Sequence, residues 1–321
     1  MSPKMKHHFP FDPSYGLTLE DLRAIAPPEP PPGFDTFWQA RYMKALAVDP
    51  KLAMRTAKTS HPDWIVQDIS FTSTDGVTIG GWLLVPRHGK IRRGLVVGHG
   101  YGGRVAPNFD LPVKETAVLF PCFRGISRSL HPPISPEPAF HVLHDIDKPE
   151  RYVIGGCVED LWVAVSALIA LFPDLGGRIG YSGISFGGGI GALAIPFDPR
   201  IERGFLEVPT FGNRALWLEL PTTGSADAVQ RYGRSHPDVL DHLRLFDAAS
   251  AATRISVPML VAVALFDPAV APPCQFSVAN ALPRANCNEI FILDAGHFDY
   301  PMDSVQQAAL SERNRRFFEV T

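Results

Sequence analysis

One serine in this chain is flanked by residues that would make it a nucleophile. Residues 178–192 read as a short apolar strand, a glycine-flanked serine and then a run of small residues suited to a helix start. In a Gly-x-Ser-x-Gly turn the serine sits on a strained bend between strand and helix, and glycines such as Gly183 and Gly187 are needed because larger side chains would collide there. The pattern predicts that Ser185 attacks an electrophilic carbon.

A serine hydroxyl needs a base to take its proton and an acid to orient that base. Asp267 follows the apolar run 259–266, and His297 follows the run 290–293. Both would lie where strands end, at the edge of the sheet where open α/β folds place their chemistry. The order serine, acid, histidine along the chain is that of α/β-hydrolases. We therefore predict that Ser185, Asp267 and His297 form a catalytic triad.

Simpler explanations exist for each of these residues taken alone. A single histidine such as His297 is more often a hydrogen-bonded structural group, and Asp267 followed by Pro268 could open a turn. Asp294 is a rival acid because it lies shortly before His297, although a place on the histidine's own loop suits a turn-forming role better. The joint order and the placement at strand ends favour Asp267.

The reaction also needs N–H donors for the oxyanion that forms when the serine attacks. The segment 94–103 reads as a buried strand that runs into a glycine-rich loop, the kind of loop that supplies one such donor. We assign this donor to the backbone N–H of Tyr101. The second donor is assigned to the backbone N–H of Phe186, the residue after the nucleophile, a role that does not depend on its side chain.

Two other patterns could suggest a cofactor. The glycines of 187–191 resemble a phosphate-binding loop, but the spacing of a dinucleotide fingerprint and its later acidic residue are missing. Four potential metal ligands fall in a proline-flanked segment without helical register, which favours a solvated loop; they are His141, His144, Asp145 and Asp147. We therefore expect neither an organic cofactor nor a metal ion.

Composition narrows the classes of partner. The 321 residues are enough for one large core, and a net charge of −3 without a basic stripe gives no sign of nucleic-acid binding. The four cysteines are scattered, which predicts reduced, mostly buried thiols. No apolar h-region follows the N-terminus, and the sequence pattern predicts no apolar run long enough to span a bilayer. We expect a cytoplasmic protein that binds a small ester, with no nucleic-acid or membrane partner.

The chain divides into a short N-terminal part and one large domain. Residues 1–60 are expected to form a proline-rich, extended arm followed by an amphipathic helix over 34–46 that packs on the body. The domain 61–321 alternates strands with helices after its first strands. This alternation predicts an α/β fold with a mostly parallel central sheet and helices on both faces.

Three segments of the large domain have more specific patterns. The stretch 65–85 has the signal of a β-hairpin, so antiparallel strands should start the sheet. A helix over 158–172 carries its apolar residues on one core-facing stripe. The irregular stretch 211–245 is rich in aromatic and polar residues, which predicts a helical cap inserted over the reactive edge.

Several motifs together resemble the acetyl xylan esterase and cephalosporin C deacetylase family. They are His99-Gly100-Tyr101-Gly102-Gly103, Arg124-Gly125, Gly183-Ile184-Ser185-Phe186-Gly187, Asp267-Pro268 and Gly296-His297, with Pro-Pro-Gly-Phe-Asp-Thr-Phe-Trp at 31–38. The resemblance covers nearly the whole chain. It implies an α/β-hydrolase that removes acetyl groups from sugar hydroxyls and similar small alcohols, with the triad and oxyanion donors named above. It also implies a homo-oligomer, because members of that family form ring-like hexamers.

Three positions depart from that family's usual residues. Phe186 stands where glutamine is usual after the nucleophile, Ile126 where glutamine is usual after Arg-Gly, and Phe298 where glutamate is usual after the histidine. Fewer polar partners for a polar substrate would favour apolar contacts. An esterase for longer or aryl acyl groups is therefore one alternative, and a catalytically silent binding module on the same fold is another.

Overall fold

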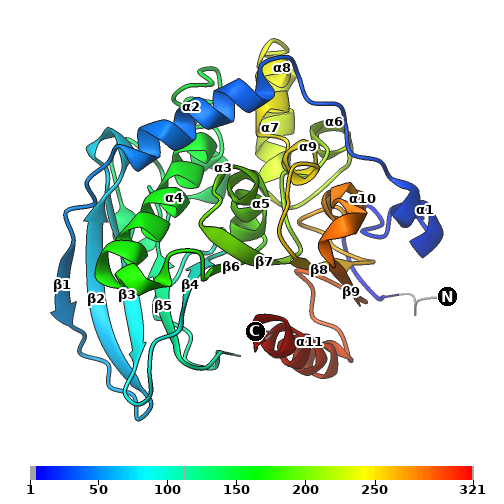
Figure 1. Ribbon diagram of the computed structural model, residues 1–321. Helices are drawn as coiled ribbons and strands as arrows, with labels where there is room; N and C mark the ends of the chain where they lie inside the picture. The colour runs from blue at the N-terminus through cyan, green and yellow to red at the C-terminus, as the bar shows by residue number, and fades with distance from the viewer. Residues whose placement is uncertain (1–4, 112, 320–321) are drawn as a thin grey trace.

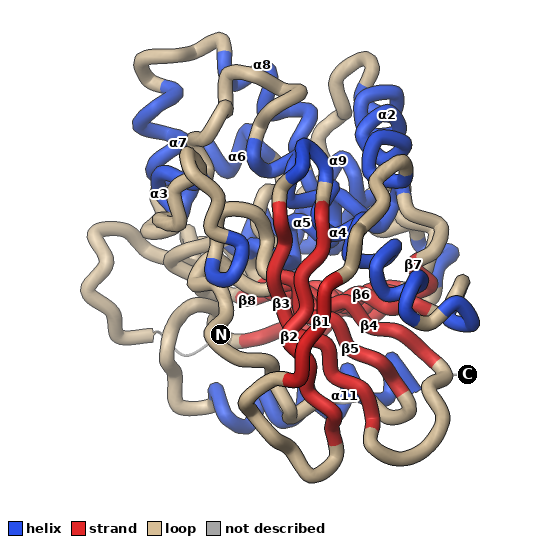
Figure 2. The backbone as a smooth tube through the Cα atoms, turned by 90° about the vertical axis from the view of Figure 1, so that its left-hand side faces the viewer, coloured by secondary structure: helices blue, strands red, loops and turns tan. Residues whose placement is uncertain are grey.

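A single mixed sheet organises the molecule in the computed structural model, which describes residues 5–111 and 113–319. Its nine strands have the order β1-β2-β3-β5-β4-β6-β7-β8-β9. They span Ala53–Thr56 (β1), Trp64–Thr72 (β2), Thr78–Pro86 (β3), Arg93–Gly98 (β4), Thr116–Pro121 (β5), Ile179–Ile184 (β6), Ile201–Glu207 (β7), Met259–Ala264 (β8) and Glu289–Leu293 (β9). The sheet has the strong twist that L-residues impose, so its first and later strands run in clearly different directions (Figure 2).

The predicted arrangement of these strands is confirmed. The hairpin expected at 65–85 is the antiparallel pair β2 and β3, and the strands from β5 through β9 pair in parallel. The edge strand β1 was not expected from the sequence. All four of its side chains are exposed, so it lacks the alternation of apolar and polar residues that marks a half-buried strand.

Helices cover the two faces of the sheet very unequally. They span Leu19–Ala24 (α1), Phe34–Leu46 (α2), Pro138–His141 (α3), Val153–Leu171 (α4), Phe186–Ala194 (α5), Arg214–Glu219 (α6), Ser225–Gly233 (α7), Val239–Leu243 (α8), Ala248–Ala252 (α9), Pro272–Ala281 (α10) and Asp303–Glu319 (α11). Figure 1 shows α11 by itself below the sheet, whereas the other long helices lie above it. We call the upper side the helical face and the lower side the α11 face.

Helix α4 is the centre of the helical face. The sequence predicted a helix over 158–172 with one core-facing apolar stripe. The helix instead begins at Val153, and it is buried on nearly all sides. Trp162 donates its indole N–H to the carbonyl of Ala194 on α5, and its ring meets Trp38 of α2 edge to face. Among the described residues α4 is also the one helix long and apolar enough to cross a bilayer, which corrects the expectation that no such run exists.

Two carboxylates of α4 are buried within this helical face. Asp160 accepts from the guanidinium of Arg124 at 2.7 Å and from the Ser73 hydroxyl at 2.6 Å. Its neighbour Glu159 pairs with Arg41 of α2 at 2.9 Å. Buried charges are tolerated when they are paired and hydrogen-bonded in this way. The pairs therefore tie α4 to α2 and to the turn between β2 and β3.

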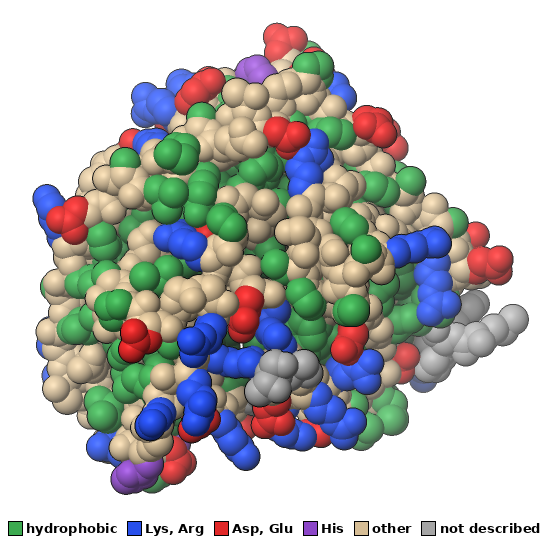
Figure 3. All heavy atoms as spheres, viewed as in Figure 1, with side chains coloured by type: hydrophobic (Ala, Val, Ile, Leu, Met, Phe, Trp, Pro, Cys, Tyr) green, Lys and Arg blue, Asp and Glu red, His purple; other side chains and the backbone are tan. Residues whose placement is uncertain are grey.

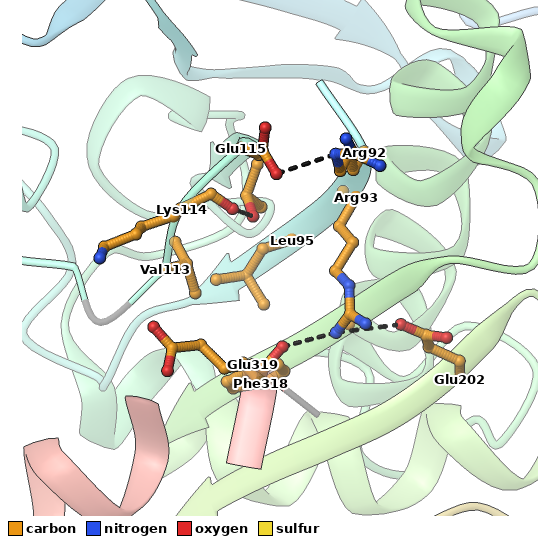
Figure 4. A pocket seen from close by; sticks show the side chains of 12 residues that line it. Arg92, Arg93, Leu95, Val113, Lys114, Glu115, Glu202, Phe318 and Glu319 are labelled. Atoms are coloured by element: carbon orange, nitrogen blue, oxygen red, sulfur yellow. Dashed lines mark hydrogen bonds and ion pairs between the residues drawn. The ribbon is translucent and has the colours of Figure 1, made fainter. Parts of the chain in front are cut away.

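The α11 face is held at one end by arginines from the sheet. Arg93 of β4 donates to the carbonyl of Phe318 at 2.5 Å, and Arg203 of β7 donates to that of Phe317. Such contacts satisfy the last carbonyls of a helix and complement the negative end of its dipole. Figure 4 shows Arg93 reaching both this carbonyl and Glu202 beside a cavity of about 350 Å³. Basic side chains gather on this lower part of the surface (Figure 3).

The N-terminal part contains more regular structure than an extended arm followed by one helix. Helix α1 lies within it, and Thr18 and Asp21 cap the start of this helix reciprocally. Helix α2 has the bounds expected from the sequence. Residues 1–4 lie outside the described residues. Three short helices, α6 to α8, fall in the range 211–245, and their role as a cap stays a prediction.

The four cysteines differ in environment. Cys122, Cys157 and Cys274 are buried, whereas Cys287 is exposed just before β9. Burial raises the pKa of each of the three buried thiols. A raised pKa keeps them protonated, and so unreactive, at neutral pH.

Candidate active site

Ser185 occupies a strained turn between β6 and α5. Its backbone has φ 53° and ψ −110°, a conformation that L-residues adopt only when their surroundings enforce it. A Cβ on Gly183 would lie 2.5 Å from the carbonyl oxygen of Gly187, so no larger residue fits there. The Ser185 N–H donates to the carbonyl of Glu207 on β7 at 2.8 Å. The turn thus holds the half-buried serine at the carboxyl edge of the sheet.

His297 reaches this serine from the loop that follows β9. Its Nε2 lies 2.9 Å from the Ser185 Oγ, and its Nδ1 lies 2.8 Å from the Asp267 Oδ2. Both distances are those of good hydrogen bonds. The three side chains selected from the sequence therefore form one continuous hydrogen-bonded chain across three strand ends.

Asp267 is completely buried, and every contact fixes its orientation. Its Oδ1 accepts from the backbone N–H groups of Ala269 and Val270, while its Oδ2 accepts from the Gln275 side chain at 2.8 Å as well as from His297. Its own N–H donates to the carbonyl of Pro13 in the N-terminal arm at 3.1 Å. These contacts hold the carboxylate in place for the histidine.

Gln275 is a site residue that the sequence reasoning missed. It lies on α10 and is fully buried. A glutamine in a helix of mostly apolar or small residues was the available signal, because buried polar groups require partners. The partner itself could not be read from spacing, since the turn between Asp267 and α10 decides which way the amide points.

The charge state of His297 follows from competing effects. Burial lowers the pKa of its imidazole, but the hydrogen bond and the charge of Asp267, with a smaller contribution from Glu207, outweigh burial and raise the pKa above its usual value of 6.5. A raised pKa means that the imidazolium is stabilised when the ring takes a proton from serine. The arrangement suits a general base that becomes transiently positive.

The two predicted oxyanion donors belong to two segments that meet beside the nucleophile. Phe186 directly follows Ser185 and opens α5, and the loop bearing Tyr101 is tied to this turn because the Gly187 N–H donates to the His99 carbonyl at 3.0 Å. Within 5–111 and 113–319, the N–H groups of Tyr101 and Phe186 donate to no protein carbonyl. Both N–H groups are therefore available to a ligand oxygen.

The apolar substitutions near the triad do not line its surface as expected. Phe186 is fully buried and stacks on the Tyr101 ring at a centroid distance of 4.1 Å. Ile126 is buried in the same core. Only Phe298 is partly exposed, and it packs against Phe266. The argument for apolar substrate contacts therefore loses two of its three residues.

The alternative acid, Asp294, and the potential metal ligand His141 each have other partners in the structure. Asp294 donates its backbone N–H to the Gln306 side chain, whereas His297 is paired with Asp267. His141 is not in a solvated loop, as the sequence suggested. It is fully buried on α3, and its Nε2 lies 2.9 Å from the Arg124 carbonyl.

Residues near His141 in space and in sequence are also paired with protein groups. Tyr101 places its hydroxyl 3.3 Å from the Nδ1 of His141, so this histidine supports the loop that carries the first predicted oxyanion donor. Asp145 pairs with Lys148 at 2.7 Å and with Arg151 at 3.1 Å. The sequence could not reveal the burial of His141, because the contacts come from residues far along the chain.

Comparison with known proteins identifies the family. The acetyl xylan esterase (AXE1) family model matches residues 13–311. The chain belongs to the acetyl xylan esterase family. Its membership and its esterase-like fold make it a carboxylic ester hydrolase with the α/β-hydrolase architecture predicted from the sequence.

Solved structures agree on the fold. Acetyl xylan esterase 1 from Thermoanaerobacterium sp. JW/SL YS485 superposes with a TM-score of 0.79 at 20% identity, covering 95% of this chain and 99% of that one. The acetyl xylan esterase from Paenibacillus sp. R4 gives 0.79 at 22% identity, covering 92% and 99%. An acylaminoacyl peptidase from Pyrococcus horikoshii gives 0.63 at 16% identity, covering 80% of this chain and 41% of the peptidase.

Proposed function

We propose that the protein is a serine esterase that removes acetyl groups from acetylated sugars or similar small alcohols. The observation that carries the proposal is the continuous hydrogen-bonded chain from Ser185 through His297 to buried Asp267. Membership of the acetyl xylan esterase family supports an acetyl ester as the substrate. The hydrogen-bonded triad argues against a silent binding module, because a buried carboxylate aimed at a histidine is costly to retain without use.

The reaction proceeds in two halves that use the same histidine. His297 takes the proton from the Ser185 hydroxyl as Oγ attacks the ester carbon, and the backbone N–H groups of Tyr101 and Phe186 stabilise the oxyanion. His297 then gives the proton to the departing alcohol, leaving an acetyl group on the serine. Water, deprotonated by His297, attacks this acyl-enzyme and releases acetate with the serine restored. Asp267 holds the imidazole and stabilises its positive form throughout.

Hydrolysis of 4-nitrophenyl acetate, butyrate and octanoate by wild type and Ser185→Ala tests this function. We expect wild type to favour the acetate, and the variant to lose about 10⁴-fold or more in kcat because the nucleophile is absent. Ser235→Ala is the matched control, since Ser235 is exposed and far from the triad in sequence. Turnover retained in Ser185→Ala would contradict the mechanism, and a preference for octanoate would contradict the acetyl assignment.

A further inference from the structure

An aromatic cluster joins the start of the N-terminal arm to the loops after β8 and β9, which carry Asp267 and His297. Figure 1 shows the start of the described chain beside β8, β9 and α10. Three segments that are far apart in the sequence therefore share one small apolar core next to the triad. Its members are Met5 and Phe9 from the arm, Phe266 from the loop after β8, and Ala295, Phe298 and Tyr300 from the loop after β9.

Two phenylalanines of this cluster are the direct neighbours of triad residues. Phe266 precedes Asp267, and Phe298 follows His297. Their rings are in contact, with centroids 5.0 Å apart. The two loops are also joined through their backbones, because the Gly296 N–H donates to the Phe266 carbonyl at 2.8 Å. A contact that fixes Phe298 therefore also restrains the backbone next to His297.

Phe9 is the arm residue that contacts Phe298. The two rings meet edge to face with centroids 6.0 Å apart and an angle of 61° between their planes, a favourable geometry for an aromatic pair. His7 stacks on Phe9 at 5.7 Å and extends the contact to Phe266 at 5.4 Å. The arm thus touches the phenylalanine beside each of the two triad residues.

A hydrogen bond ties the arm to Asp267 at a second point. The Asp267 N–H donates to the carbonyl of Pro13, which is buried, at 3.1 Å. A turn fixes the direction of this carbonyl, because the Tyr15 N–H donates to the Asp12 carbonyl at 2.9 Å and the Ser14 N–H donates to the Asp12 carboxylate at 2.9 Å. The arm is therefore anchored to the loop of the triad acid independently of its aromatic contacts.

His297 depends on its neighbours for its position. Its backbone has φ 48°, a conformation that L-residues keep only when the surroundings enforce it. Its side chain is 28% exposed, yet the ring must meet Ser185 at 2.9 Å and Asp267 at 2.8 Å at the same time. A reacting group holds such a geometry when packed residues around it are rigid. Phe298 is the adjacent residue that supplies this packing.

We propose that residues 7–15 are a support of the active site, and that Phe9 is a positioning residue that acts through Phe298 on the orientation of His297. The proposal rests on the esterase function proposed above. The family match begins at residue 13, so it does not account for the contact between Phe9 and Phe298. Loss of the Phe9 ring should loosen His297 and slow the reaction, because small misplacements of a reacting group are costly.

Phe9→Ala in the full-length protein tests the proposal, with Phe197→Ala as the matched control. Phe197 is also partly buried and contacts two aromatic rings, those of Phe34 and Trp38, on the helical face. Phe9→Ala should lower kcat for 4-nitrophenyl acetate about tenfold and change KM less than about twofold, because a positioning effect acts on the transition state. Phe9→Leu keeps most of the apolar volume and should retain at least about half of the wild-type kcat. Phe197→Ala should leave kcat and KM unchanged.

The pH dependence gives a readout that a purely structural role would not move. Asp267 and Glu207 both raise the pKa of His297, and a loosened hydrogen bond to Asp267 would raise it less. Activity falls with falling pH when His297 becomes protonated. In Phe9→Ala this fall in kcat/KM should therefore move to lower pH, whereas Phe197→Ala should keep the wild-type profile.

An NMR titration separates failure of this proposal from failure of the esterase function. Histidine resonances of the Ser185→Ala protein report the pKa of His297 without turnover, and the signal is assigned from its loss in His297→Asn. Addition of Phe9→Ala should lower this pKa. A lowered pKa in a protein that hydrolyses no ester would support the role of the arm while contradicting the esterase.

A double variant tests whether Phe9 acts through Phe298. In a Phe298→Ala background, Phe9→Ala should lower kcat by less than about a further twofold, because residues that act as a unit are not additive. A further tenfold loss would overturn this route. The whole proposal would be overturned if Phe9→Ala matched Phe197→Ala in kcat and in the pKa of His297. A raised KM with unchanged kcat would overturn it in favour of direct contact between the arm and the substrate.

Discussion

The two faces of the central sheet are built differently. The helical face buries α4 on nearly all sides and accommodates even its carboxylates as paired groups. The α11 face is covered by one long helix and retains cavities of about 350 and 190 Å³. Dense packing tolerates little change of volume or charge, whereas a face with open space can adjust. The comparison indicates that stability depends mainly on the helical face and that the α11 face tolerates substitution more easily.

Substitution of a triad residue at the reactive edge, where these two faces meet, should have the largest effect, which is a loss of activity. Asp267→Asn should lower kcat about 10⁴-fold for 4-nitrophenyl acetate, because His297 loses the carboxylate that orients it and stabilises its positive form. Wild-type kcat/KM should fall as pH drops through the raised pKa of His297, since only the neutral ring accepts the serine proton. In the variant only the smaller contribution of Glu207 still opposes the effect of burial on this pKa, so the fall should move to lower pH.

A pH–rate profile of both proteins checks this prediction. Unchanged far-UV circular dichroism would show that the fold is intact. A fall at the same pH in wild type and variant would mean that Asp267 does not set the pKa of His297.

Removing an arginine that pairs with a carboxylate should destabilise the protein more on the helical face than at an exposed part of the sheet. Arg124→Met leaves Asp160 buried without its cation and should destabilise the protein by about 3–5 kcal/mol. Arg128 also pairs with a carboxylate, Asp68, but its side chain is 37% exposed. Arg128→Met should therefore cost less than about 1 kcal/mol. Urea unfolding measures both values, and equal costs would contradict the comparison.

Adding one methyl group at a glycine on each face should give the smallest difference in stability, but it compares the packing of the two faces most directly. A Cβ on Gly191 of α5 would lie 2.2 Å from the ring of Tyr181, which is fully buried and bonded through its hydroxyl to Gly187. A Cβ on Gly180 would lie 2.6 Å from the Phe318 ring, which borders both cavities. Gly191→Ala should cost about 2 kcal/mol, and Gly180→Ala less than about 1 kcal/mol.

Thermal unfolding of the two glycine variants gives the measurement. The larger fall in Tm should belong to Gly191→Ala, even though alanine is the better helix former. A larger fall for Gly180→Ala would show that the Phe318 ring cannot move into the neighbouring space.

The sequence was informative where function depends on order along the chain. Ser185, Asp267 and His297 each follow a strand of the parallel part of the sheet, so the topology alone brings them to one edge. Their catalytic roles stay predictions until tested. The turn at Ser185 could be predicted because its glycines are required by steric contacts between residues that are adjacent in the sequence.

Contacts between distant segments could not be read in the same way. The support of Asp267 by Gln275 and by the Pro13 carbonyl depends on how α10 and the arm lie against the site. The burial of His141 and Phe186 depends on a shared aromatic cluster with Tyr101. The cavity of about 190 Å³ between α11 and strands β4, β6 and β7 was likewise hidden, because spacing does not reveal how closely one helix covers a sheet.

The uneven burial of the thiols has a practical consequence. Maleimide reagents attack accessible thiolates, and Cys287 is the one exposed cysteine of the four. It precedes β9, whereas His297 follows the same strand, so the two lie toward opposite ends of it. A fluorophore, spin label or resin attached through Cys287 would need no engineered mutation, and an immobilised protein would keep its reactive edge turned toward the solution.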